Sequence, residues 1–185
     1  MERFLTFEYL NSKDNNFEQK AIICESNSYS YNQKVTAFLS HRHNEPIDLI
    51  KKVKGFFASQ GVNLYIDWLD KDMPKVTNSE TAEKLKNKIK TSDKFIVLAT
   101  PQSIESIWIP WEIGLADQIK GLKNIAVLPL VSKGSNWEKR EYYQLYSRIE
   151  YYNGKWLVLN PDYGIVKKCA VIEYPKSEIG IYQAA

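Results

Sequence analysis

Cysteine is scarce in this sequence, and neither sign of charge dominates. The 185 residues contain two cysteines, Cys24 and Cys169, which are too far apart to form a metal-binding or redox motif. That usage suits a reducing cytosol. The formal net charge is +3 and no dense basic block occurs, so nothing argues for a nucleic-acid partner. No apolar run approaches bilayer length, and the first ten residues carry charges that a signal peptide would lack. We therefore expect a cytoplasmic protein that binds neither nucleic acid nor membrane.

The rest of the composition is that of an ordinary globular protein. Hydrophobic residues make up 44% of the chain and charged residues 25%. The length fits one domain with extensions and allows a core without disulfide or metal staples. Residues 1–33 are polar, so we interpret them as an N-terminal extension. Residues 34–160 form the predicted main domain, and residues 161–185 a C-terminal tail.

Predicted strands and helices alternate along the main domain. Apolar residues recur at helical spacing from Ile47 to Phe57 before Gly61, and the capping-box pattern Thr77–Glu80 predicts the start of a second helix. Buried strands are predicted at Val35–Leu39, Val62–Ile66, Lys94–Ala99 and Ile125–Leu130. This alternation is typical of an α/β fold with a central parallel sheet and helices on both faces.

The pattern changes after the fourth strand. Residues Trp137 to Tyr146 suggest a helix, and Asn153-Gly154 predicts a two-residue turn between strands at 147–152 and 155–159. One more strand is expected around Val171. We therefore predict a C-terminal β-hairpin extension of the sheet.

A further helix is predicted to begin at Pro110 and end near Gly121. Ile109 precedes the proline and is therefore expected to leave helical geometry. Glu112 would lie in the first helical turn, where the helix N-terminus favours negative charge. Its face of the helix is otherwise apolar, formed by Leu115, Ala116 and Ile119.

Two interpretations of Glu112 follow from this placement. It is either a charge at the rim of the helix, with Trp108 and Trp111 in the core, or a buried carboxylate with a function. Burying a charge costs free energy unless something compensates it. In parallel α/β sheets, sites lie where the carboxyl ends of the strands meet. Three segments should converge there, namely Ser40–Glu45, Asp67–Asp72 and Thr100–Glu112.

Four motifs in this order resemble the TIR (Toll/interleukin-1 receptor) domain family, over about residues 33 to 132. They are Ala37–His41, the loop Ile66–Pro74, the run Glu83–Ile89, and Trp108-x-x-x-Glu112 continuing to Ala116. The resemblance implies a flavodoxin-like fold with strand order 2-1-3-4-5. It is closest to bacterial stand-alone members such as the TIR proteins of Thoeris defence, many of which cleave NAD+ at the nicotinamide–ribose bond.

The resemblance assigns the catalytic role to Glu112. It implies that the loops after the first two strands help hold the nucleotide, through Ser40, His41 and Arg42 and through Asp67, Trp68 and Asp70. NAD+ would be a substrate, and no cofactor is implied. The resemblance also implies self-association that completes the site through residues 67–76, and a separate effector protein that senses the nucleotide product. On this basis an isolated monomer should be nearly inactive.

The chemistry is compatible with a single carboxylate. Glycoside hydrolysis generally uses a second carboxyl group to protonate a poor leaving group. Nicotinamide leaves from a cationic ring and becomes neutral, so it needs no general acid. One carboxylate can stabilise the oxocarbenium-like ribose, and a site sheltered by Trp108 and Trp111 would strengthen that effect. Water, giving ADP-ribose, or a group of the nucleotide itself, giving a cyclic ADP-ribose isomer, would then attack.

The other candidate residues keep two interpretations each. The Arg42 guanidinium would either donate two hydrogen bonds to the pyrophosphate or remain a solvated charge. Trp68 would stack on a base or anchor the loop against a partner. Asp67 and Asp70 would bind substrate or cap backbone N–H groups. The two histidines, His41 and His43, have no third ligand, so we predict no metal site.

Other protein classes share this type of sheet. A receiver domain needs an aspartate at the end of strand three, where the sequence has Leu98 to Pro101, and a flavodoxin needs a glycine in the loop Ser40–Glu45. Both are excluded. A nucleoside deoxyribosyltransferase-like enzyme and a TIR scaffold without catalysis remain as alternatives. The biological setting would be anti-phage defence or depletion of host NAD+ by a virulence factor.

Overall fold

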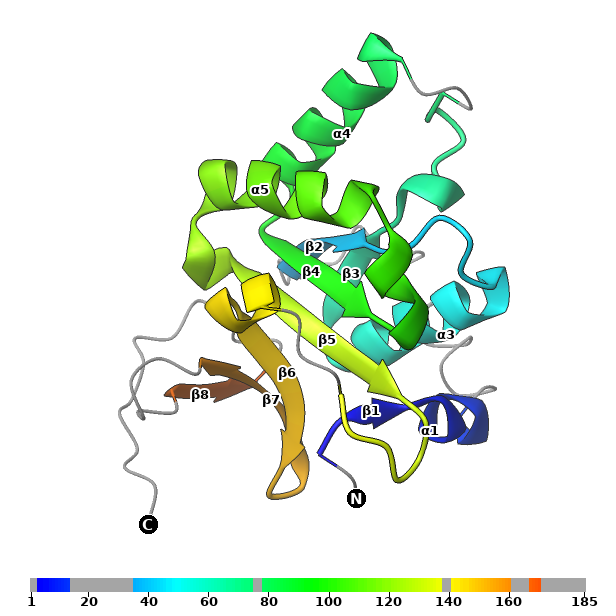
Figure 1. The fold of residues 1–185 in the computed structure, drawn as a ribbon, viewed down its shortest axis with the longest axis vertical. Helices are drawn as coiled ribbons and strands as arrows, with labels where there is room; N and C mark the ends of the chain where they lie inside the picture. The colour runs from blue at the N-terminus through cyan, green and yellow to red at the C-terminus, as the bar shows by residue number, and fades with distance from the viewer. Residues whose placement is uncertain (1–2, 14–34, 75–77, 138–140, 161–166, 171–185) are drawn as a thin grey trace.

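The computed structural model describes residues 3–13, 35–74, 78–137, 141–160 and 167–170. Its centre is a mostly parallel sheet in the order β3-β2-β4-β5-β6-β7-β8, with β1 paired to β5 (Figure 1). Numbered from β2, the first five of these strands have the order 2-1-3-4-5, as the resemblance implied. The strands are β1 (Leu5–Thr6), β2 (Val35–Ser40), β3 (Val62–Tyr65), β4 (Lys94–Ala99), β5 (Ile125–Val131), β6 (Ser147–Tyr152), β7 (Lys155–Asn160) and β8 (Lys167–Ala170).

Helices cover both faces of the sheet. Because successive side chains of a strand point to opposite faces, Leu39 of β2 packs with α3 and the neighbouring Phe38 packs with α4 and α5. Each face therefore has its own apolar core, and the prediction of a doubly covered α/β fold is confirmed. The helices are α1 (Phe7–Ser12), α3 (Ile47–Ser59), α4 (Ser79–Thr91) and α5 (Trp108–Lys120), and the short 3-10 segments are η1 (Asp67–Leu69), η2 (Pro101–Glu105), η3 (Leu122–Asn124) and η4 (Glu141–Leu145).

The predicted β-hairpin is confirmed. Strands β6 and β7 pair antiparallel, with Tyr152 opposite Lys155. Asn153 and Gly154 between them have φ of 48° and 83°, and two positive φ values are what a type I′ turn requires. Strand β8 extends this part of the sheet, although Val171 lies outside the described residues. The helix predicted from Trp137 to Tyr146 is wrong in its described part, where only the short segment η4 forms.

The chain near the N-terminus packs onto the sheet. Leu5 and Leu10 are fully buried, and Leu5 pairs with Leu130 of β5. The Arg3 carbonyl accepts from the N–H of Tyr151 at 2.8 Å. The Arg3 guanidinium donates to the buried carboxylate of Glu150 at 2.6 and 3.1 Å. Residues 3–13 thus pair with the end of β5, beyond the residues that pair with β6, and brace β6. The division of the chain at residues 33 and 160 stays a prediction.

The start of α5 differs from the prediction. The helix begins at Trp108, so Pro110 is its third residue, and Ile109 is helical and fully buried. The proline is tolerated because no N–H of the first turn has a partner within the helix, and the N–H of Ile109 is accepted by the Ser106 hydroxyl at 3.3 Å. Glu112 therefore lies in the second turn, where the helix N-terminus does less to stabilise a charge.

The buried stripe of α5 is also shifted from the predicted one. It consists of Ile109, Glu112, Ile113 and Ala116. Ile119 is 39% exposed, because the stripe is centred close to Ile109 and Ala116 and leaves Ile119 at its border. At α4 the cap is Asn78, whose side chain accepts from the N–H of Thr81 at 2.9 Å, so Ser79 is the first helical residue.

Candidate active site at the carboxyl edge of the sheet

The connections that follow β2, β3 and β4 converge, as predicted, at one edge of the sheet. Ser40 is the last residue of β2, and its hydroxyl donates to the Glu112 carboxylate at 2.5 Å. Asp67 opens η1 directly after β3 and is close enough to affect Glu112 electrostatically. Side chains from three separate connections therefore meet at one point.

Glu112 is a buried carboxyl group with an unusual proton affinity. Only 3% of the residue is exposed, so the interpretation of Glu112 as a rim charge is wrong. Burial raises the pKa of Glu112 to about 8, and the negative charge of Asp67 adds to this effect. The hydrogen bond from Ser40 lowers the pKa and only partly offsets burial. With this pKa the Glu112 carboxyl is mostly protonated near neutral pH, and a positive charge beside it would favour the anion.

Asp67 lies between two histidines. The residue is 7% exposed, and its carboxylate accepts from the N–H of Trp68 at 2.9 Å. His41 Nδ1 lies 3.9 Å from one of its oxygens, and His43 Nε2 lies 3.9 Å from the other. Burial lowers the pKa of His41, which keeps this imidazole neutral, whereas the His43 side chain is 49% exposed. The two rings lie nearly parallel, 6.3 Å apart.

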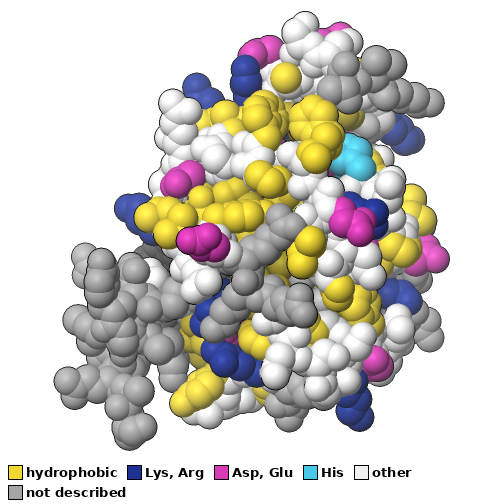
Figure 2. All heavy atoms as spheres, in the orientation of Figure 1, with side chains coloured by type: hydrophobic (Ala, Val, Ile, Leu, Met, Phe, Trp, Pro, Cys, Tyr) yellow, Lys and Arg dark blue, Asp and Glu magenta, His cyan; other side chains and the backbone are white. Residues whose placement is uncertain are grey.

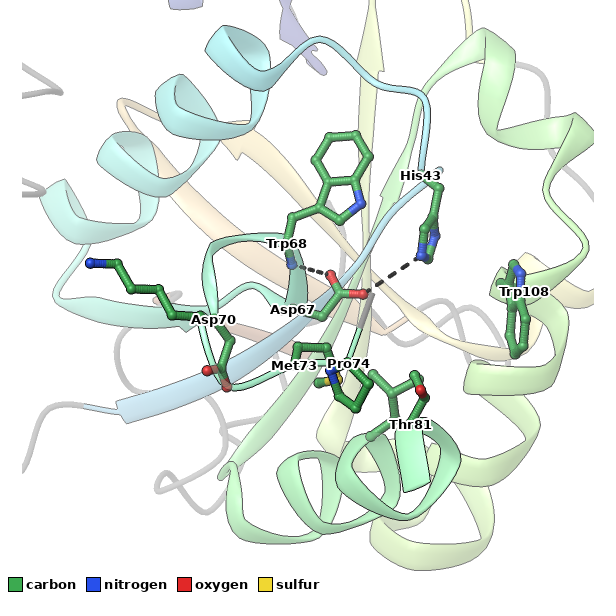
Figure 3. A pocket seen from close by; sticks show the side chains of 10 residues that line it. His43, Asp67, Trp68, Asp70, Met73, Pro74, Thr81 and Trp108 are labelled. Carbon is green, nitrogen blue, oxygen red and sulfur yellow. Dashed lines mark hydrogen bonds and ion pairs between the residues drawn. The ribbon is translucent and has the colours of Figure 1, made fainter. Parts of the chain in front are cut away.

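A cavity of about 350 Å³ opens beside this cluster. Figure 3 shows His43, Asp67, Trp68 and Trp108 around it, with Asp67 joined by dashed lines to His43 and Trp68. Ser40, His41 and Glu112 are not among its lining residues; they lie in the buried layer that Asp67 connects to the cavity. The lining comprises His43, Asp67, Trp68, Asp70, Lys71, Met73, Pro74, Thr81, Leu85 and Trp108.

Tryptophans form part of the cavity wall, as the sequence suggested. Trp68 meets His41 edge to face at 5.0 Å between ring centres and is 36% exposed. Trp108 lies 6.4 Å from the His43 ring. Trp111 does not line the cavity; it packs edge to face against Trp108 at 5.8 Å and is 39% exposed. Trp111 can therefore shelter the site only by supporting Trp108.

Asp70 has structural partners for both carboxylate oxygens. One oxygen accepts from the Tyr65 hydroxyl at 2.6 Å and lies 3.2 Å from Lys88 Nζ. The other accepts from the N–H of Asp72 at 3.0 Å. These contacts hold the loop after β3 against α4 and lower the pKa of Asp70, the Tyr65 bond contributing most. The role of Asp70 as a nucleotide ligand stays a prediction.

Arg42 faces away from the cavity. Its guanidinium donates to Glu105 at 2.8 Å and lines a separate hollow beside Phe7 of α1 and Pro46 at the start of α3. To meet a pyrophosphate in the cavity, Arg42 would have to leave Glu105. Its assignment to substrate binding is therefore a prediction that this geometry does not favour.

A buried hydrogen-bond chain, which the sequence did not reveal, holds the connection before α5. The Thr100 hydroxyl donates to Glu45 at 2.6 Å and accepts from the N–H of Ser103 at 3.0 Å. All three residues are buried. The chain ties the loop after β2 to η2, and so fixes the two segments that carry Ser40 and Glu112.

Thr100→Val should therefore lower the free energy of unfolding by about 1–3 kcal/mol, because it leaves the buried Glu45 oxygen without its hydroxyl donor. The Ser103 N–H would keep only the Thr100 carbonyl as acceptor, at 3.2 Å. Urea denaturation measures this. Thr100→Ser keeps the hydroxyl and is the matched control. Equal stability of the valine and serine variants would contradict a role for the hydroxyl.

Several lining residues were not predicted to belong to the site. His43 was weighed only as a metal ligand, and Thr81 lies in no motif. Met73, Pro74 and Leu85 fall within motifs of the resemblance but were assigned no role. They reach the cavity because the loop after β3 folds back onto α4. Within the described residues, no three His, Cys, Asp or Glu side chains are placed to hold a metal ion. Among the helices that the structure describes, none combines the length and apolarity needed to cross a bilayer.

The sheet order and the site at its carboxyl edge define a flavodoxin-like α/β protein, and the sequence pattern of the TIR domain matches residues 37–156. The chain belongs to the TIR domain family. It is 28% identical over 127 residues to the "Probable 3' cyclic ADP-D-ribose synthase ThsB'" of Bacillus cereus (strain MSX-D12), covering 66% of this chain and 64% of that protein. It is 26% identical over 129 residues to the "Putative cyclic ADP-D-ribose synthase TIR2" of Cytobacillus dafuensis, covering 61% of this chain and 34% of the relative. The alignments thus span less than two thirds of either relative.

Proposed function

We propose that this TIR protein cleaves the nicotinamide–ribose bond of NAD+ and releases ADP-ribose or a cyclic ADP-ribose isomer. The observation that carries the proposal is the buried Glu112 carboxyl, held by Ser40 at 2.5 Å behind the cavity at the carboxyl edge of the sheet. The two relatives, both named as cyclic ADP-D-ribose synthases, support NAD+ as the substrate.

The raised pKa of Glu112 suits a cationic substrate. The nicotinamide ring of NAD+ is positively charged, and positive charge develops on the ribose as the bond breaks. Either charge favours the ionised carboxylate, since an opposite charge nearby stabilises the charged form. Binding should therefore release the proton from Glu112 and place an anion where the oxocarbenium-like ribose forms. In a site sheltered from water, that stabilisation is large.

The neighbours of Glu112 have supporting roles in this proposal. The Ser40 hydroxyl orients the carboxylate, and Asp67 keeps its proton affinity high until the cation arrives. Trp68 and Trp108 offer aromatic faces at the cavity on which a base can stack. The cavity does not open directly onto Glu112, so productive binding requires the side chains around Asp67 to move.

Self-association and a downstream effector complete the proposed function. Exposed apolar side chains gather on the side of the molecule that carries α5 (Figure 2). Apolar patches on a protein surface often mark interaction sites, which supports TIR–TIR contacts. These side chains include Ile107 at 82%, Trp111 at 39%, Ile119 at 39% and Leu122 at 50% exposure. A nucleotide product would act as a cytoplasmic signal to a separate protein in anti-phage defence.

Incubating the full chain with NAD+, followed by mass spectrometry of the products, tests the proposal. We expect nicotinamide together with ADP-ribose or an isomer of cyclic ADP-ribose, and a specific activity that rises with protein concentration. Parallel incubation with deoxynucleosides tests the deoxyribosyltransferase alternative. Intact NAD+ at high protein concentration, with and without phage-infected lysate, would contradict the proposal and favour a scaffold.

A further inference from the structure

His43 occupies a fixed position at the mouth of the cavity. It lies in the turn after β2, which is closed by a hydrogen bond from the Glu45 N–H to the Arg42 carbonyl at 3.0 Å. Both ends of this turn are tied to the connection before α5, through the bonds of Arg42 to Glu105 and of Thr100 to Glu45. The half-exposed imidazole is therefore presented to the cavity by a loop braced on both sides.

Asp67 faces one nitrogen of this imidazole. His43 Nε2 lies 3.9 Å from the carboxylate, which the Trp68 N–H holds at 2.9 Å (Figure 3). A carboxylate beside one ring nitrogen stabilises the positive charge that the imidazole acquires when its other nitrogen takes a proton. The edge of Trp68 at 6.0 Å and the ring of Trp108 at 6.4 Å flank His43 on the cavity side. The arrangement is that of a carboxylate–imidazole pair open to a ligand.

The proposed reaction offers a role for such a group. When water or a ribose hydroxyl attacks C1′, a C–O bond forms, the C1′–N bond breaks, and its electron pair leaves with neutral nicotinamide. The attacking oxygen must also lose a proton. Glu112 is engaged with Ser40 and with the developing cation, so a second group at the cavity is better placed to accept that proton.

On the basis of the proposed function, we propose that His43 is a catalytic general base that takes the proton from the attacking hydroxyl or water, with Asp67 stabilising the resulting imidazolium. The C–O bond then forms as the proton moves to His43, and the proton passes to solvent after the product leaves. Histidine is the side chain most often used in this way.

The other polar groups of the described lining are poorer bases. Asp70 has both carboxylate oxygens engaged, and a Lys71 ammonium has no acceptor atom. Thr81 carries a hydroxyl, which is only weakly basic. Asp67 is buried and already accepts from Trp68. His43 combines an available ring nitrogen with a place on the cavity wall.

A pyridine nucleophile separates proton removal from bond cleavage. 3-Acetylpyridine can replace nicotinamide on C1′, and we call the resulting dinucleotide the exchange product. It attacks through a ring nitrogen that carries no proton, so this replacement needs Glu112 but no group that accepts a proton. For His43→Gln, we expect the products of oxygen attack, which are ADP-ribose and any cyclic product joined through a ribose oxygen, to fall by about a hundredfold relative to exchange product, compared with the unaltered protein. Glu112→Gln should lower both reactions together.

The controls distinguish failure of this inference from failure of the proposed function. Asn44→Gln, in the same exposed turn, should leave the ratio unchanged, and thermal unfolding should show that His43→Gln is folded. An unchanged ratio in folded His43→Gln, or parallel loss of both products, would overturn the role of His43 as a base. If the unaltered protein forms neither product, the proposed function itself fails.

Discussion

Glu112→Gln should lower the rate of nicotinamide release from NAD+ by about a thousandfold, while leaving the fold intact. Glutamine has the same size and can still accept the hydrogen bond from Ser40, which is 2.5 Å from the carboxylate in the structure. It cannot carry the negative charge that stabilises the oxocarbenium-like ribose. Losing one preorganised electrostatic group of this kind typically costs a factor of about 10² to 10³ in rate, and here the lost interaction is with a full charge. Single-turnover and steady-state assays of nicotinamide release measure the effect.

The matched control is Glu83→Gln on the exposed face of α4. Its side chain is 65% exposed and pairs with Lys86, so the same chemical change is made without touching the site. This variant should release nicotinamide at an unchanged rate. Activity of folded Glu112→Gln within a few-fold of the control, at equal protein concentration, would remove Glu112 from the mechanism, while cleavage of NAD+ by the protein would stand.

The sheet could be predicted from the sequence because its signals are local. Phe95 to Ala99 of the fully buried strand β4 form an uninterrupted apolar run, and the hairpin turn has two residues that tolerate positive φ. The position of Glu112 among apolar helix residues was also visible, and its burial is confirmed. Pro110 misled the prediction of the helix start, because proline is favoured at the first residue of a helix but is also tolerated at the third.

The parts that could not be predicted depend on contacts between distant residues. The bond between Thr100 and Glu45 joins residues 55 apart, and Arg3 meets Glu150 across 147 residues. Neither pair has a spacing that periodicity can detect. Strand β1 is two residues long, so it forms only because β5 offers it an edge. The parallel alignment of β2 and β3 likewise brings His43 close to Asp67, and no sequence motif predicts this contact.

The same alignment determines the electrostatics of the site. Strand ends in register bring Ser40, Asp67 and Glu112 together, although each belongs to a different connection. Each residue type alone is common at a helix cap or a loop. Their combination in a buried layer gives the carboxyl of Glu112 a proton affinity that no single segment would give it.

The pH dependence of catalysis should report this proton affinity directly. The groups around Glu112 are the Ser40 hydroxyl, which lowers its pKa, and the Asp67 carboxylate, which together with burial raises it to about 8. Since only the ionised form stabilises the cation, kcat/KM for NAD+ should rise about tenfold per pH unit below pH 8 and level off above it. The residual activity of Glu112→Gln should lack this step. A profile of the unaltered protein that is flat between pH 6 and 9 would contradict the assignment.

Stability should change with pH in the opposite direction. The folded protein holds the Glu112 proton up to about pH 8, whereas the unfolded chain releases it near the ordinary value of 4.5. Between these values the native state binds more protons, so the free energy of unfolding falls as pH rises, by up to about 1.4 kcal/mol per unit. The contribution is fully present below pH 4.5 and is lost above pH 8.

Glu112→Gln should remove this pH-dependent contribution, so the variant should gain stability relative to the unaltered protein from pH 5 to pH 9 in urea denaturation. Because the substitution should lower activity and raise stability at alkaline pH, parallel losses of both would indicate that the glutamate serves the fold and not the reaction.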